Sequence, residues 1–475
     1  MKFSQAFRLD KVQAELDFVD INTARDTRLF LDPYAIQIKQ NLFSEECSTH
    51  IRVFFAEILA CLRERDVARA QHLTGYLTEP QETFLGFSKG RPRGRGMGRF
   101  QADQLLAAFR SSRAFRTGIL SDLSEAELFV AGIAQDKISD LTTNVLRGPL
   151  IRYTQAQCNL HGVKLDEVPS GAIWNPSAAR WEKHFVPLPL IQGQAVILVP
   201  KYFVRWRLSL DSQEFYNHHM LSYLREENLE AHSSLVQFFK NGEPYVTKKR
   251  LKQEHPFAKD ALADFARKHP EVLEKYKELA GARGSLENED FDRSFNERTF
   301  AQSLRVLLRE IPAGMQHAGR YHSFTMGVLT FLFYPHLINP TKELELNEGR
   351  KRIDIVFTNA GESGFFSVIA RSRQMRALMV IVECKNYNRE LGNPELDQIC
   401  GRFSHTRGYF GMLLCRQVFD ERLMERRCKD LARDKEEYVL VLDDEKVSRM
   451  LRLVEENRRD DIQGYLHTRL ARLNS

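Results

Sequence analysis

Two carboxylates and a lysine lie at the ends of two apolar segments in the C-terminal third of the chain. Asp354 lies in the run 352–357, and Glu383 closes the run 378–383, two residues before Lys385. Because alternate side chains of a β-strand share a face, Glu383 and Lys385 are expected to point the same way. An unpaired charge at the end of such a strand is costly, so these groups need one another or a metal ion.

If the two strands pair, Asp354 and Glu383 can converge on one divalent ion. Carboxylates are hard oxygen ligands and suit Mg²⁺ or Mn²⁺, and the backbone carbonyl of Cys384 is a natural further ligand. Such an ion polarises a phosphate and helps to form hydroxide from water. Lys385 is then placed to orient or deprotonate that water, or to steady developing charge.

Several strand-like runs and helical stretches are expected to position these residues. The runs are 352–357, 378–383, 409–414 and 438–442, and helices are expected at 321–333, 395–403 and 421–432. Strands that alternate with helices indicate an α/β layer.

The acidic residues and the lysine resemble the active site of the PD-(D/E)xK nuclease superfamily. The matching residues are Asp354 and Glu383-Cys384-Lys385, and the resemblance covers roughly residues 315–445. The position of the motif's proline is Ile353 in this chain. The resemblance implies an α/β domain with a mixed sheet of restriction-endonuclease-like type. It also implies an Mg²⁺-dependent or Mn²⁺-dependent endonuclease that hydrolyses phosphodiester bonds.

The resemblance extends to further site residues. Some members carry a Gln facing the site in the helix after the lysine strand, where this chain has Gln398, so Gln398 is either a catalytic residue or an ordinary polar group of the helix. Many relatives bring another acid from the helix before the first strand, but in this chain that acid is absent or is replaced by His322. We interpret His322 as a helix-start residue and predict Glu348 as the remaining metal ligand, with Glu345 and Gln398 as alternatives.

Arginines near two parts of the chain are candidates for contact with nucleic acid. Glycine and arginine alternate over 89–99, a pattern that favours an exposed basic loop and that lets guanidinium groups approach a phosphate backbone. The alternative is a solvated flexible loop. The predicted contacts are Arg91, Arg93, Arg95, Arg99, Arg350 and Arg352.

The N-terminal part is predicted to be mainly α-helical with a small β component. Apolar residues at helical spacing favour a helix over 48–69, and Ser124 with Glu127 has the form of a capping box. A β-rich patch is expected over 194–207. Asp136, Asp140 and Asn144 would line one face of a helix, either as a polar ligand or metal site or, as we favour, as a solvent face with a capping role.

These patterns predict four regions. Residues 1–165 form a helical recognition or regulatory region, and 166–285 form a small β and helical region that ends in a linker at 281–285. Residues 300–450 form the nuclease domain, and 451–475 form a C-terminal helix.

Composition fits a globular chain of 475 residues with 43% hydrophobic and 28% charged residues and a net charge of +6. The seven cysteines are scattered without a C-x-x-C pair, which argues against a zinc site or a disulfide framework. The chain has no apolar run long enough for a membrane span and no secretory signal, so we expect a cytoplasmic protein without a membrane partner.

A nuclease domain joined to a large unfamiliar region resembles prokaryotic restriction or anti-phage defence effectors. The expected partner is nucleic acid, in particular double-stranded DNA, together with a homo-oligomer or a partner defence protein. The alternatives are a catalytically silent nucleic-acid-binding or assembly subunit and a DNA-repair nuclease.

Overall fold

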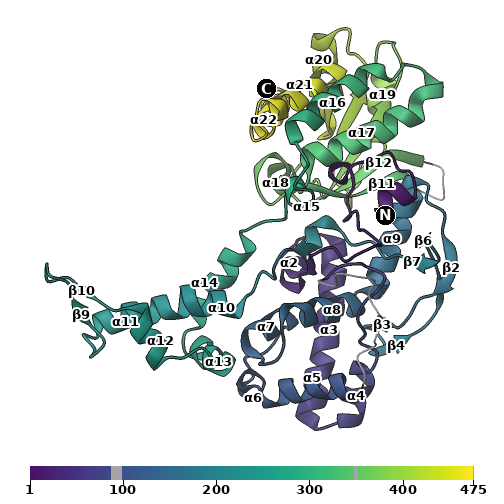
Figure 1. Cartoon of the computed structure of the whole chain (residues 1–475). Coiled ribbons are helices and arrows are strands. Elements are labelled where there is room, and N and C mark those ends of the chain that lie inside the picture. The colour runs from purple at the N-terminus through teal and green to yellow at the C-terminus, as the bar shows by residue number, and fades with distance from the viewer. Residues whose placement is uncertain (87–98, 347–350, 474–475) are drawn as a thin grey trace. The chain divides into compact units, whose positions relative to one another are not determined.

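The computed structural model describes residues 1–86, 99–346 and 351–473 (Figure 1). By its internal contacts the chain divides into two compact units. The first comprises Met1–Phe3, Ile21–Gln155 and Lys164–Ser285, and the second comprises Ser4–Asp20, Ala156–Val163 and Leu286–Ser475. The main boundary falls at Ser285, at the end of the glycine-containing segment 281–285.

The first unit is mainly helical. Its helices are α2 (Pro33–Gln37), α3 (Leu42–Glu64), α4 (Val67–Thr74), α5 (Arg99–Ser111), α6 (Arg113–Thr117), α7 (Ala126–Phe129), α8 (Gln135–Val145), α9 (Arg147–His161), α10 (Ser212–Glu214), α11 (Leu221–Glu230), α12 (Lys248–Glu254), α13 (Lys259–Lys268) and α14 (Pro270–Gly281). Residues Phe215–Met220 form a π-helix. The last residues of α9, from Ala156, are counted with the second unit.

The strands of the first unit are short and pair in twos, all antiparallel. The pairs are β1 (Phe30–Leu31) with β8 (Val204–Arg205), β2 (Asp166–Pro169) with β5 (Phe185–Leu188), β3 (Ile173–Asn175) with β4 (Arg180–Glu182), β6 (Leu190–Ile191) with β7 (Gln194–Ala195), and β9 (Gln237–Phe238) with β10 (Pro244–Tyr245). The predicted small β component of this region is confirmed.

The long helix α3 shows why the first unit is helical. Ile51, Phe54, Phe55 and Ile58 recur at helical spacing and are all buried, so one face of α3 packs into the core. The side chain of Asn41 caps the first turn by accepting from the Ser44 N–H at 3.0 Å.

The expected β-rich patch over 194–207 is wrong for most of its length. Only β7 and β8 are strands there, and each has two residues. The N–H of Ile197 donates to the Glu82 carbonyl, and that of Leu198 donates to the Thr154 hydroxyl, both at 2.8 Å. Because scattered acceptors satisfy this buried apolar backbone, it needs no strand partner.

The predicted capping box is shifted by two residues. Asp122 and Glu125 form it, rather than Ser124 and Glu127. The carboxylate of Glu127 accepts instead from the N–H and the hydroxyl of Ser212, at 2.6 and 2.9 Å. Glu127 therefore links α7 to the start of α10.

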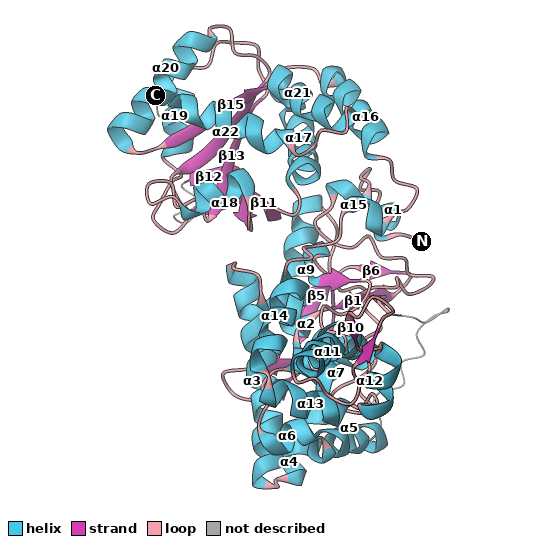
Figure 2. Cartoon of the chain, turned by 90° about the vertical axis from the view of Figure 1, so that its left-hand side faces the viewer, coloured by secondary structure: helices cyan, strands magenta, loops and turns pink. Residues whose placement is uncertain are grey.

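The second unit is built on a five-stranded mixed sheet. Its order is β11 (Leu337–Leu346), β12 (Lys351–Asn359), β13 (Met379–Lys385), β14 (Phe410–Cys415) and β15 (Tyr438–Asp443). The helices are α1 (Phe3–Ala6), α15 (Asn288–Phe291), α16 (Glu297–Glu310), α17 (Ala318–Phe333), α18 (Gly364–Arg371), α19 (Asn393–Cys400), α20 (Glu421–Lys435), α21 (Asp444–Glu455) and α22 (Asp461–Leu473). Figure 2 shows strands of this sheet in magenta with helices around them.

The direction of the strands changes at β13. The pairs β11–β12 and β12–β13 are antiparallel, whereas β13–β14 and β14–β15 are parallel. Parallel neighbours require a crossover, and α19 and α20 supply one each. The predicted α/β layer is confirmed. β14 and β15 are buried at every position, as the apolar runs 410–415 and 438–442 indicate.

Two segments from earlier in the chain complete the second unit. Ala14, in the short 3₁₀ helix Gln13–Glu15, is buried in the core with residues of α17. The side chain of Asp17 accepts from the N–H of Asn339 at 3.0 Å, at the bulge of β11.

All seven cysteines are buried free thiols. Within the described residues, no helix combines the length and the apolar character needed to cross a membrane.

Candidate active site

The candidate site forms where β12 and β13 stop pairing. The last pair in register is Ile355 with Val382, so Asp354 and Glu383 follow directly opposite one another. Opposite residues of an antiparallel pair project from the same face of the sheet. The register therefore brings the two predicted carboxylates together.

Asp354 also contacts the backbone of β13. Its Oδ2 accepts a hydrogen bond from the Cys384 N–H at 2.9 Å. This side-chain hydrogen bond thus links β12 to β13 just beyond their last backbone pair. The side chain is about one-quarter exposed, at 23%, so the carboxylate is still open to water.

Glu383 is fully buried among polar groups. Its Oε2 accepts from Gln398 Nε2 at 3.1 Å and lies 3.6 Å from Lys385 Nζ, and its Oε1 lies 3.6 Å from Arg402 Nε. Burial, followed by the charge of Asp354, raises the pKa of Glu383 to about 7. Lys385 and Arg402 oppose that rise but do not cancel it.

Gln398 holds the lysine in place. Its Oε1 accepts from Lys385 Nζ at 2.7 Å, while its amide nitrogen donates to Glu383. One amide from α19 therefore fixes both the acid and the base of the Glu-x-Lys motif. The thiol of Cys384, between them, lies beside Thr325 of α17 and within 4.8 Å of the Asp354 carboxylate.

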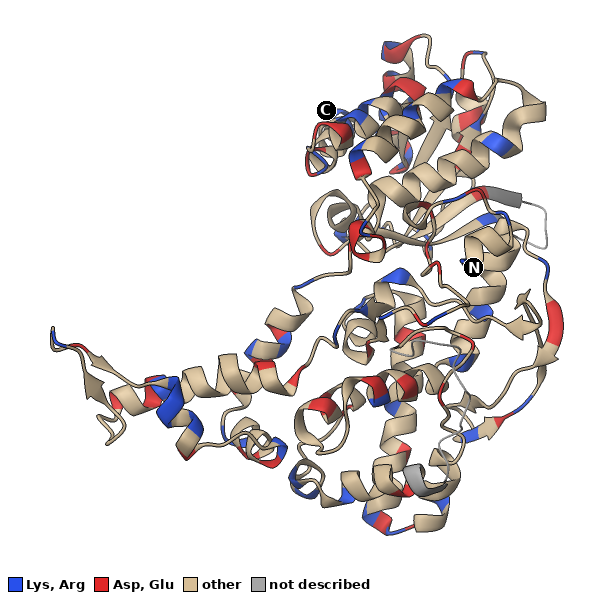
Figure 3. Ribbon diagram, in the orientation of Figure 1, with Lys and Arg blue, Asp and Glu red and all other residues tan. Residues whose placement is uncertain are grey.

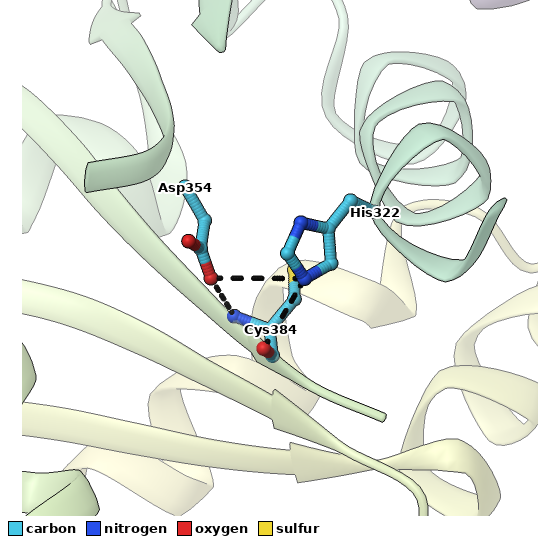
Figure 4. Close-up of side chains that lie close together, drawn as sticks. All are labelled: His322, Asp354 and Cys384. Atoms are coloured by element: carbon cyan, nitrogen blue, oxygen red, sulfur yellow. Dashed lines mark hydrogen bonds and ion pairs between the residues drawn. The ribbon is translucent and has the colours of Figure 1, made fainter. Parts of the chain in front are cut away.

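His322 reaches the same point from α17 (Figure 4). Its Nε2 lies 3.3 Å from the Cys384 carbonyl oxygen and 3.8 Å from Asp354 Oδ2. Nitrogen, carboxylate oxygen and carbonyl oxygen thus converge on one small region. His322 lies in the second turn of α17, not at its start, so the interpretation as a helix-start residue is wrong in position.

The donor set fits a divalent cation. A ring nitrogen of His322, a carboxylate oxygen of Asp354 and the thiol sulfur of Cys384 all lie within 4.8 Å of one another, and the Cys384 carbonyl oxygen lies 3.3 Å from His322 Nε2. Within the described residues, Glu383 Oε1 is a buried carboxylate oxygen without a hydrogen-bond partner; its nearest cationic group is Arg402, with Nε 3.6 Å away, so it keeps capacity for a further ligand. Burial raises the pKa of the Cys384 thiol well above its usual range, so its carbonyl is the better ligand for a hard ion.

Other predicted site residues lie outside the described residues, or have only their backbone described. Glu348, Arg350, Arg91, Arg93 and Arg95 lie outside the described residues. For Arg99, Glu345 and Arg352 only the backbone is described, in α5, β11 and β12. Their predicted roles stay predictions.

The structure also places Arg402, which is not among the predicted site residues, against Glu383 with its side chain 13% exposed. Arg402 lies two residues beyond the end of α19 at Cys400, so helical spacing from Gln398 does not predict its contact with Glu383. Like Glu383 Oε1, its Nε has no hydrogen-bond partner among the described residues.

Away from this site, part of the polar face of α8 is buried and hydrogen-bonded rather than exposed to solvent. Asn144 is buried and donates to the carbonyls of Thr78 and Asp140, at 2.6 and 2.7 Å. Burial, and then the charges of Asp136, Glu79 and Asp26, raise the pKa of Asp140 to about 7. The favoured prediction of a solvent face is therefore wrong at Asn144.

Comparisons with known proteins gave one match, which covers the N-terminal part of the chain. A family model described as a domain of unknown function, DUF8370, matches residues 8–211. The match ends before β11 and includes none of the site residues. Comparisons with curated proteins and with solved structures found no match.

Proposed function

We propose that the chain is a metal-dependent endonuclease of the PD-(D/E)xK type, with a restriction-endonuclease-like second unit that hydrolyses phosphodiester bonds of DNA. The observation that carries this proposal is the register of β12 and β13. It sets Asp354 opposite Glu383 at a strand end and leaves Lys385, fixed by Gln398, on the same face.

Each residue has a role that its surroundings support. Asp354, Glu383, the Cys384 carbonyl and His322 would hold Mg²⁺ or Mn²⁺. When bound, such an ion polarises the phosphate and lowers the pKa of water. Lys385 would orient the attacking water, which adds to phosphorus while the bond from phosphorus to the leaving oxygen breaks. Its ammonium group also stabilises the charge that develops on the phosphate oxygens.

The proposal also includes a biological role for this nuclease activity. A nuclease unit attached to a larger helical unit suits an effector of prokaryotic anti-phage defence or restriction, acting in the cytoplasm with nucleic acid as its partner. The first unit would then recognise the target or regulate cleavage.

Cleavage of supercoiled plasmid DNA with Mg²⁺ or Mn²⁺ tests the proposal. Glu383→Gln and Lys385→Ala should each lower the rate by about 100-fold or more, because each removes a group that acts on the reacting phosphate. EDTA should abolish cleavage. Asp397→Asn and Lys435→Ala are matched controls, since this exposed pair lies on α19 and α20 and makes only a 3.8 Å surface ion pair.

The outcomes separate the alternatives. If the wild type and the two site variants behave alike, the enzyme proposal fails and a silent binding subunit is favoured. If RNA alone is cut, the assignment to DNA fails. A preference for branched or broken ends over intact circles would indicate a repair nuclease.

A further inference from the structure

A hairpin in the first unit exposes two phenylalanines. β9 and β10 pair antiparallel, and Lys240, Asn241 and Gly242 form the loop between them. Gly242 has φ +84°, the left-handed conformation that a three-residue hairpin loop needs at its last position. Phe238 is 67% exposed and Phe239 is 54% exposed, which is unusual for side chains of this size.

The two rings lie on opposite faces of the hairpin. Neighbouring residues of a strand point to opposite sides, so Phe238 and Phe239 cannot pack on one another there. Phe239 stacks on Tyr245 instead, with ring centroids 4.0 Å apart and an interplanar angle of 26°. The hairpin therefore presents a stacked aromatic platform on one face and a lone exposed ring on the other.

A basic helix follows the hairpin directly. α12 carries Lys248, Lys249, Arg250 and Lys252, all exposed, while Leu251 and the preceding Val246 are buried and anchor the segment (Figure 3). Among the described residues, no carboxylate lies within ion-pair distance of these four cations. Between positions 237 and 254 there are five cations and two carboxylates. The segment 237–254 thus carries an excess of positive charge.

We propose that this aromatic hairpin (237–245) and α12 together bind single-stranded nucleic acid. Exposed aromatic rings stack on bases, and neighbouring Lys and Arg residues hold the phosphates, which is the combination that single-strand binding requires. In a duplex both faces of each base are already stacked, so the rings would engage only an unpaired segment or an end.

The layout of the hairpin favours this occupant over an anionic membrane. Its outermost residues are Lys240, Asn241 and Gly242, which are polar or small, and the phenylalanines lie behind them. A membrane-inserting loop would carry its apolar side chains at the tip. The choice of nucleic acid rests on the proposed function, and it narrows the substrate to DNA with an unpaired segment.

Binding can be measured without cleavage. The full chain carrying Lys385→Ala, in EDTA, is titrated into a labelled DNA single strand, the matching duplex, and vesicles of anionic phospholipid. Phe238→Ala with Phe239→Ala should weaken single-strand binding by about tenfold or more. Lys249→Ala with Arg250→Ala should also flatten the dependence of log Kd on log salt, by about 0.7 for each phosphate that the variant no longer neutralises.

Matched controls come from the same unit. Phe185→Ala removes a phenylalanine of β5 that is 74% exposed, and Lys164→Ala with Arg180→Ala removes two exposed cations from surface ion pairs. Neither change should alter binding. Equal effects of control and hairpin variants would overturn the proposal.

Three further outcomes would also overturn it: no preference for the single strand over the duplex, binding to vesicles that depends on the phenylalanines, or no binding to any probe. Because no cleavage is measured, each outcome is distinct from failure of the nuclease proposal, which the plasmid assay reports.

Discussion

At the scale of single residues, His322 would bring a nitrogen donor to the proposed metal site, whose other proposed ligands are oxygen atoms of Asp354, Glu383 and the Cys384 carbonyl. Its Nε2 lies within 4 Å of both the Cys384 carbonyl and Asp354. Imidazole suits transition ions, whereas carboxylates and carbonyls also accept Mg²⁺ readily. The proposed metal site would therefore favour Mn²⁺ over Mg²⁺ more strongly than an all-oxygen site would.

We predict that His322→Ala weakens Mn²⁺ binding by about tenfold or more, since it removes a ligand. His322→Asp should restore binding and shift the preference towards Mg²⁺. Titration calorimetry of the metal-free chain measures both without any substrate. His405→Ala, which changes an exposed histidine, is the control. Unchanged Mn²⁺ affinity in His322→Ala would remove His322 from the ligand set.

The position of some of these residues in the site could be predicted from the sequence, and that of others could not. Asp354, Glu383 and Lys385 could be predicted because charges at fixed spacing stand out in apolar strands, and β-sheet geometry alone brings them together. The contacts of His322 depend on the path of α17 across the sheet. No spacing in the sequence encodes that path.

At the scale of elements, α8 carries an acidic residue in an unfavourable setting. Asp140 is mostly buried beside the carboxylates of Asp136, Glu79 and Asp26, and its pKa is raised from 3.8 to about 7. Below pH about 4 both the folded and the unfolded chain bind this proton, so the group costs no stability. As the pH rises towards 7 the unfolded chain loses the proton first, so folding becomes less favourable.

Asp140→Asn should therefore stabilise the protein above neutral pH. We expect a gain on the order of 2 kcal/mol in the free energy of unfolding at about pH 8, disappearing near pH 4. Denaturant unfolding at the two pH values measures it. Asp434→Asn, an exposed acid of α20, should show no such pH dependence. A gain that is equal at both pH values would mean that charge burial is not the cause.

Elements were predictable where local pattern and final packing agree. The runs that became β12 to β15 are apolar and flanked by polar segments, so their burial in a sheet follows from sequence. β11 was missed because Asn339 and Pro340 interrupt it, and the structure accommodates both at a bulge. The apolar run 196–199 has a strand's composition, yet its backbone bonds go to separate partners rather than to one neighbouring strand.

At the scale of the whole molecule, units that are compact in space are not continuous in sequence. Ser4–Asp20 and Ala156–Val163 belong to the unit that contains the sheet, although a linear division assigns them to the N-terminal region. Their placement rests on tertiary contacts such as the one between Lys11 Nζ and the Ser323 carbonyl at 3.4 Å. Periodicity and composition do not report contacts of that kind.

Two glycines of α17 test how closely the N-terminal segment packs there. A Cβ at Gly327 would lie 2.6 Å from Glu15 Oε1 and 2.8 Å from Lys11 Nζ, whereas a Cβ at Gly319 would meet nothing within 4 Å. Lys11 and Glu15 form an ion pair whose side chains are only 7% and 11% exposed, so neither moves away freely.

We therefore expect opposite effects from the same substitution. Gly319→Ala should stabilise the protein by up to about 1 kcal/mol, because alanine restricts the unfolded chain and favours the helix. Gly327→Ala should destabilise it by about 1–3 kcal/mol, because the added methyl displaces the buried pair. Thermal unfolding of the full chain measures both. If both variants gain stability equally, residues 11–15 do not pack on α17, and the division of the chain into these two units is wrong at that segment.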